Sequence, residues 1–207
     1  MTTRQSKILG GLLAAAVGDA MGAATEIRST EMIKERFGGY VKDIVQAPED
    51  TWAHWSTAGM VTDDFSVSYF SAEEFLANGG VISEEAAAKA VIRWSEHPLY
   101  GQCAGPTTRA AIAKLKGLPV PPSKHDRLLC VNSRASNGAP MKVGCVGLFN
   151  AGDVDKAIDD AITAIRAIPE PFTKTATGSE AENAVKVVGT DLVKVIDEVH
   201  AEIVRNR

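Results

Sequence analysis

The sequence predicts an all-α fold. Apolar residues recur at helical spacing in several segments, capping residues stand at the ends of those segments, and no βαβ alternation or internal repeat is present. The chain has 207 residues, 45% hydrophobic and 23% charged, which is long enough to bury a sizeable core. We therefore expect a single domain over residues 1–207.

The first helix is expected over about residues 7–24. Its small residues Gly11, Ala15, Gly18 and Gly22 recur at helical spacing and would let another helix approach closely. Each interior glycine costs about 1 kcal/mol relative to alanine, so tight packing must offset that cost. The segment also imitates a secretory signal, with basic residues followed by an apolar run. Asp19 falls within the supposed cleavage region, which favours a cytoplasmic protein.

The second and third helices are bounded by local signals. A short helix should follow Ser29 or Thr30 and stop at Gly38. Residues 41–55 read as an irregular connection with one short strand. Thr62 is then a good N-cap for a helix that ends before Gly79.

The remaining helices follow the same logic of caps and breakers. Residues 118–142 are rich in Pro, Ser, Asn and Gly and predict a long loop. A capping box at Ser179–Glu182 and an apolar stripe through Ile196 predict helix near the C-terminus. Between these, helices are expected from Ser83 to before Pro98, from Gly105 to Lys116, and from Asp153 to before Pro169.

Composition excludes several classes of protein. The net charge is -4 and no basic stripe is interleaved with aromatic residues, so a nucleic-acid partner is not expected. No stretch approaches the about 20 apolar residues of a membrane span. Three cysteines without a Cys-x-x-Cys pair predict free thiols in a reducing compartment rather than disulfides or a zinc site.

The segment "TDDFSVSYF" places two aspartates directly before an apolar run. If Thr62 is the N-cap, Asp63 and Asp64 occupy the first helical turn, where the helix dipole favours negative charge. Capping explains one carboxylate well and two adjacent ones less well. Adjacent side chains diverge by about 100°, so a hydroxyl and two carboxylates flank one point and form an oxygen site suited to Mg²⁺ or Mn²⁺.

A second pair of acidic residues lies in the first helix. Asp19 and Glu26 are seven residues apart and share one side of it, with Gly22 leaving space between them. Carboxylates near a helix C-terminus meet the unfavourable end of the dipole, unless a positive species is close. Acidic residues in two separate helices therefore point towards a shared cation.

Four segments, in order, resemble the ADP-ribosylglycohydrolase family. They are "GGLLAAAVGDAMGAATE", "VTDDFSVSYF", "AGPTTRAA" and "SNGAPMKV", which together lie within about residues 8–165. The resemblance implies an all-α orthogonal multi-helix bundle. It also implies hydrolysis of an ADP-ribosyl N- or O-glycosidic linkage, two Mg²⁺ or Mn²⁺ ions, and ADP-ribose or an ADP-ribosylated molecule as ligand. The opening helix would then belong to the core.

Site residues follow from the resemblance position by position. Thr62, Asp63 and Asp64 match metal ligands, and Glu26 matches an acidic residue beside the metals that is implicated in catalysis. Gly105, Pro106 and Thr107 match a loop near the phosphates or ribose of the ligand. Asn137, Gly138 and Met141 match the segment that lines the ADP-ribose cleft.

The C-terminal region departs from the family pattern. The resemblance fades after about Ile165, and residues 166–207 read as a divergent helical region. The family's second metal motif is reduced to "VGTD", residues 188–191, which is either a half-site for metal or a helix N-cap. Three readings stay open: a hydrolase holding one or two ions, a catalytically inactive relative that binds ADP-ribose or serves a structural role, and a fragment of a longer enzyme.

Overall fold

The computed structural model describes residues 3–120, 138 and 140–167. Within those ranges it is built of α-helices and two short 3-10 helices, with no strand, which confirms the all-α class. The elements are α1 (Arg4–Gly22), α2 (Thr30–Phe37), α3 (Asp63–Ala77), α4 (Glu84–Glu96), η1 (Gly101–Cys103), α5 (Pro106–Leu115), η3 (Pro140–Val143), α6 (Val146–Phe149) and α7 (Val154–Arg166).

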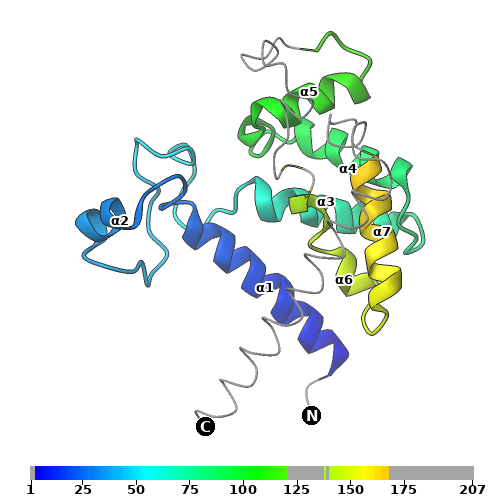
Figure 1. The fold of residues 1–207 in the computed structure, drawn as a ribbon, viewed down its shortest axis with the longest axis horizontal. Helices are drawn as coiled ribbons and strands as arrows, with labels where there is room; N and C mark the ends of the chain where they lie inside the picture. The colour runs from blue at the N-terminus through cyan, green and yellow to red at the C-terminus, as the bar shows by residue number, and fades with distance from the viewer. Residues whose placement is uncertain (1–2, 121–137, 139, 168–207) are drawn as a thin grey trace.

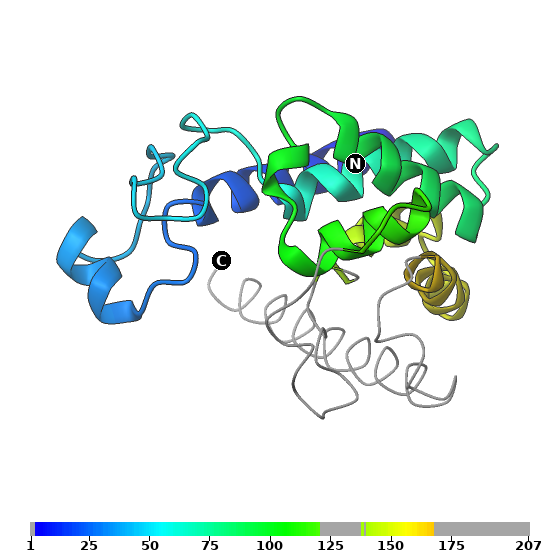
Figure 2. The same cartoon turned by 90° about the horizontal axis from the view of Figure 1, so that it is seen from above.

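The helices are unevenly distributed along the molecule. The α2 helix and the loop that follows it lie at one end, joined to the rest through α1 (Figures 1 and 2). The α3 and α4 helices pack closely on each other, α4 also contacts α5 and α7, and η3 packs against α3. The N-terminal end of α3 therefore lies between the α2 end and the helix cluster (Figure 1).

Most helix ends are set by local hydrogen bonds that the sequence predicts. Ser29, Ser83 and Asp153 each accept a hydrogen bond at an N-cap, from the backbone N–H three residues later. Gly38 closes α2 with a φ of 71°, a left-handed conformation that glycine adopts without a Cβ clash. The predicted helices over residues 30–37, 84–96, 106–115 and 154–166 are thus confirmed.

Two buried clusters hold the helices together. One contains Trp94 and Val67 together with Cys103, and the other is built around Phe75. Trp94 and Phe75 are fully buried, so each removes a large aromatic surface from water. Met141 packs against the Trp94 cluster, which ties η3 to the start of α3.

The first helix differs from its expected role in the core. Ala20 is its only buried residue within the described structure, and Leu9, Leu13 and Val17 are 57%, 56% and 45% exposed. Nothing in the described structure comes within 4 Å of a Cβ added at Gly18 or of one added at Gly22. Within the described residues the glycines of the stripe show a close approach only at Gly11, where an added Cβ would lie 4.0 Å from the Leu148 side chain, so most of the predicted close helix approach is not seen.

Three further expectations differ from the structure or fall outside it. Residues 41–55 form no strand. The predicted loop contains η3 within its described part, and the short helix α6 was not anticipated. The capping box at 179–182, the stripe through Ile196 and the segment 188–191 lie outside the described residues. No helix in the described ranges has the length and hydropathy needed to cross a membrane.

Candidate functional site

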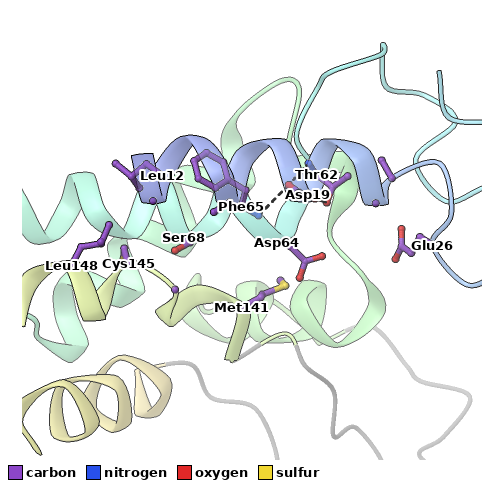
Figure 3. Close-up of a pocket in the computed structure, with 16 residues that line it drawn as sticks. Leu12, Asp19, Glu26, Thr62, Asp64, Phe65, Ser68, Met141, Cys145 and Leu148 are labelled. Carbon is purple, nitrogen blue, oxygen red and sulfur yellow. Dashed lines mark hydrogen bonds between the residues drawn. The ribbon is translucent and has the colours of Figure 1, made fainter. Parts of the chain in front are cut away.

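Asp19 caps helix α3 from a distance of 43 positions along the chain. Its Oδ2 accepts hydrogen bonds from the backbone N–H of Thr62 at 2.7 Å and of Phe65 at 3.2 Å, and its Oδ1 accepts from the Thr62 hydroxyl at 2.5 Å (Figure 3). Thr62 occupies the N-cap position, but its side chain makes no capping hydrogen bond. The predicted N-cap position of Thr62 is therefore confirmed, but the capping hydrogen bonds are accepted by Asp19.

This contact also explains how a carboxylate is tolerated at the C-terminal end of α1. The sequence points to a nearby positive species, and the N-terminus of α3 supplies partial positive charge through its free N–H groups. Charge-assisted hydrogen bonds to a carboxylate are about twice as strong as neutral ones. Asp19 thereby joins α1 to α3 at the site.

A chain of hydrogen bonds continues from Thr62 into the core. The Ser66 hydroxyl donates to the Thr62 carbonyl at 2.5 Å, and the Trp94 indole N–H donates to the Ser66 hydroxyl at 2.8 Å. Ser66 and Trp94 are both buried. The first turn of α3 is thus held by α1 on one side and α4 on the other, which limits its freedom to move.

A cavity of about 610 Å³ opens beside this helix end, and we name it the carboxylate cavity (Figure 3). Its walls come from α1, the first two turns of α3, and the segment running from η3 into α6. Glu26, Asp64 and Met141 all line this cavity, so residues from three separate sequence motifs lie around the same space. Gly18 and Gly22 leave part of its wall without side chains, which keeps the space open.

The two adjacent aspartates face different surroundings. Asp64 is exposed and lines the carboxylate cavity, whereas Asp63 is partly buried and is absent from its lining. This divergence follows from the helix itself, because neighbouring residues point about 100° apart. Burial, together with the nearby charge of Asp63, raises the pKa of the Cys103 thiol to about 12.

Four carboxylates therefore stand close together: Asp19, Glu26, Asp63 and Asp64. Burial, reinforced by the charges of Asp64, Glu26 and Asp19, raises the pKa of Asp63 to about 6. Burial and then the charges of Asp64 and Asp19 also raise the pKa of Glu26, and burial and then Asp19 raise that of Asp64. None of the four forms an ion pair with a lysine, arginine or histidine in the described part of the chain. Such a cluster attracts a cation.

The donor types suit a hard divalent cation, although their positions do not make a finished cage. Carboxylate and hydroxyl oxygens are the ligands that Mg²⁺ and Mn²⁺ prefer. Among residues 3–120, 138 and 140–167, no group of three or more acidic, histidine or cysteine side chains converges tightly enough to hold a metal as it stands. The Thr62 hydroxyl donates its proton to Asp19, which leaves its oxygen lone pairs free to face a cation.

The other residues matched by the resemblance do not line the carboxylate cavity or fall outside the described residues. Gly105 is the N-cap of α5, and Pro106 and Thr107 form its first turn, and none of the three lines the cavity. Gly138 is buried and is also absent from the lining. Asn137 falls outside the described residues.

Sequence reasoning missed part of the wall. Ser68, Cys145 and Leu148 also line the carboxylate cavity. Of these three, only Ser68 could have been found from the sequence, because it lies on α3 one turn after Asp64. Burial raises the pKa of the Cys145 thiol to about 11, which disfavours the reactive thiolate form.

Comparison with known proteins shows to which family the chain belongs. The family model described as ADP-ribosylglycohydrolase matches residues 1–173. The chain belongs to the ADP-ribosylglycohydrolase family.

The match to one curated relative shows how the length of this chain compares with that of a related protein. The chain is 29% identical over 165 residues to the uncharacterised protein YegU of Escherichia coli strain K12. The match covers 78% of this chain and 47% of YegU, so the chain spans about half the length of that relative.

Proposed function

We propose that this chain binds an ADP-ribosyl compound in the carboxylate cavity and hydrolyses its glycosidic bond, with release of ADP-ribose. The single observation that carries the proposal is the meeting of Glu26, Asp64 and Met141 at one cavity. These residues come from three motifs that are far apart in the sequence of a glycohydrolase family member. A cavity of about 610 Å³ falls within the usual size range of small-molecule sites.

Thr62, Asp63 and Asp64 are the residues that would hold Mg²⁺ or Mn²⁺. Water would complete the coordination, since Mg²⁺ dehydrates reluctantly and usually keeps several waters. A divalent ion at this place supplies positive charge for the carboxylate cluster and a template for the ribose hydroxyls. The first turn of α3 is well suited to carry these ligands because Asp19 and Ser66 anchor it.

Glu26 is the residue that moves the proton. In the hydrolysis, the bond from C1 of the ribose to the leaving atom breaks, and its electron pair stays with the leaving atom. The oxygen of water forms the new bond to C1, and one water proton ends on the leaving group. The raised pKa of Glu26 brings it closer to neutral pH, where a carboxyl group both accepts and returns a proton.

The test is release of ADP-ribose from mono-ADP-ribosylated arginine and serine peptides and from an ADP-ribosyl compound with an aromatic leaving group, with excess Mg²⁺ or Mn²⁺. We expect slow release, because the second metal motif of the family is reduced to one aspartate in residues 188–191. Loss of one ion removes several kcal/mol of transition-state stabilisation, and each ~1.4 kcal/mol is tenfold in rate. The Glu26→Gln variant should abolish the release.

Two results would revise the proposal. Turnover at ~1 per second or above would mean that the second site is complete after all, through Asp191 or another chain. ADP-ribose binding without any release, in the parent as in Glu26→Gln, would instead favour an inactive relative that binds ADP-ribose.

A further inference from the structure

A second cavity shares Glu26 with the carboxylate cavity, and we name it the tryptophan cavity. It has a volume of about 490 Å³ and is formed by the turn after α1, the loop of residues 49–55, and residues from η1 and α5. Glu26 lines both cavities. A ligand bound at Glu26 therefore borders both cavities.

Two indole rings form part of the wall of this cavity. Trp52 is 46% exposed, which is unusual for so large an apolar side chain, and Trp55 is partly buried against the core cluster of Trp94. Exposed tryptophan in a hollow is a common means of binding flat ligands, since aromatic rings gain from offset stacking beyond the area they bury. The ligand suited to this wall has a planar ring.

Arg28 offers an unsatisfied donor in the same cavity. Its Nη2 donates to the Asp50 carbonyl and lies 3.1 Å from the Asp50 carboxylate. Its Nε is buried and has no hydrogen-bond partner in the described part of the chain. A buried donor without an acceptor is costly and uncommon in folded proteins. An oxygen acceptor on a ligand would remove that cost.

Arg109 provides a second positive charge. Its Nε donates to the Ala104 carbonyl at 2.7 Å and its Nη2 to the Gln102 carbonyl at 3.3 Å. No carboxylate within the described ranges pairs with it, whereas the nearby Asp50 is already shared by Arg28 and Arg36. The guanidinium of Arg109 is thus held in place by backbone oxygens with its charge unmatched, which suits a carboxylate or amide oxygen.

We propose that the tryptophan cavity binds the leaving group of the reaction, and that this group is a planar aromatic ring bearing a carboxylate or carboxamide. The assignment rests on the proposed function, because it is the position of Glu26 between the two cavities that makes the second one the leaving-group side. The rings of Trp52 and Trp55 would receive the planar face, and Arg28 and Arg109 would receive the oxygen.

The proposal is tested with nicotinate, nicotinamide and cyclohexanecarboxylate as probes, on the full chain in EDTA, by calorimetry and tryptophan fluorescence. Two of the three tryptophans line the cavity and Trp94 is buried, so stacking should quench a large part of the signal. We expect nicotinate to bind with a Kd of about 1 mM or below. Nicotinamide should bind several-fold more weakly, and cyclohexanecarboxylate, which lacks a flat ring, at least tenfold more weakly.

Matched variants separate the parts of the cavity. Trp52→Leu should lower nicotinate affinity at least fivefold, and it should leave the fold intact because Trp52 is exposed. Arg109→Gln should do the same, whereas Lys34→Gln on exposed α2 removes an equal charge and should leave the affinity unchanged. Equal nicotinate binding by the parent, Trp52→Leu and Arg109→Gln would overturn the proposal, as would absence of binding by the parent.

Two controls keep this proposal separate from the function of the carboxylate cavity. The Asp63→Asn plus Asp64→Asn variant should bind nicotinate as the parent does. The nicotinate result therefore does not depend on whether the chain binds metal or hydrolyses a substrate. ADP-ribose and nicotinate should bind together, since they are the two products in adjacent cavities. Competition between them would overturn the leaving-group assignment even if hydrolysis occurs.

Discussion

The carboxylate of Asp19 accepts three hydrogen bonds at the start of α3, two of them from Thr62. The pair joins the first long helix to the helix that carries the Asp63–Asp64 motif. It therefore sets where Asp64 stands relative to Glu26, and the geometry of the carboxylate cavity depends on it.

Asp19→Ala should destabilise the protein more than the loss of an ordinary cap. An exposed N-cap contributes about 1 kcal/mol, and charge-assisted hydrogen bonds contribute about 1.5–3 kcal/mol. We expect a loss of about 2–3 kcal/mol in the free energy of unfolding, measured with urea. Asp153→Ala, which removes a local cap on α7, is the matched control and should cost about 1 kcal/mol. Equal losses in the two variants would argue against the special role of Asp19.

Asp19→Asn separates the cap from the charge. The amide keeps an acceptor oxygen for α3 and removes the repulsion with Glu26 and Asp64. It should therefore cost clearly less than Asp19→Ala under the same conditions.

Without metal, the stability of the protein should fall as pH rises from about 4 to 6. The pKa of Asp63 is about 6 in the folded chain against 3.8 in the unfolded chain, so the folded state binds the proton more tightly. Protonation of Asp63 therefore stabilises the folded state at low pH, and this stabilisation is lost as Asp63 ionises. The expected decrease is on the order of 2 kcal/mol. Urea unfolding in EDTA at several pH values measures it.

The matched variants for this pH effect are Asp63→Asn and Asp64→Asn. Asp63→Asn should be more stable than the parent at pH 7. Its free energy of unfolding should change much less between pH 4 and 6 than that of the parent. Asp64 is the more exposed of the pair, so Asp64→Asn should retain much of the fall in stability between pH 4 and 6. If parent and Asp63→Asn follow parallel curves, another group is responsible.

Calorimetric titration with Mn²⁺ should detect binding that depends on Asp63 and Asp64. The expectation follows from a carboxylate cluster without an ion-pair partner in the described residues and from oxygen donors of the type that Mn²⁺ prefers. The double alanine variant should lose the binding entirely. Unchanged Mn²⁺ affinity in that variant would reduce the pair to a helix-end role.

Binding of ADP-ribose should slow hydrogen exchange in two separate segments, residues 105–107 and 137–141. Met141 lines the carboxylate cavity, and the first turn of α5 offers free backbone N–H groups to an anionic ligand. Amides of the exposed helix α2 serve as the internal reference. Protection restricted to one segment would mean that the two do not share a cleft.

The sequence by itself determined most of the helices, because most of their ends depend on neighbours within four residues. Ser29, Ser83 and Asp153 cap from three residues away, and Gly38 ends α2 by its own backbone conformation. The family also followed from the sequence, since its motifs are short and ordered. That Asp63 and Asp64 begin a helix is the same kind of local information.

Only the tertiary structure decided how those residues are used. Asp19 caps a helix that begins 43 positions later, and no local pattern encodes such a contact. The same holds for the gathering of Glu26, Asp64 and Met141 at one cavity and of Trp52, Arg28 and Arg109 at another. A side chain's partner across the fold depends on how whole helices pack, and packing is set by the shape of buried surfaces rather than by spacing along the chain.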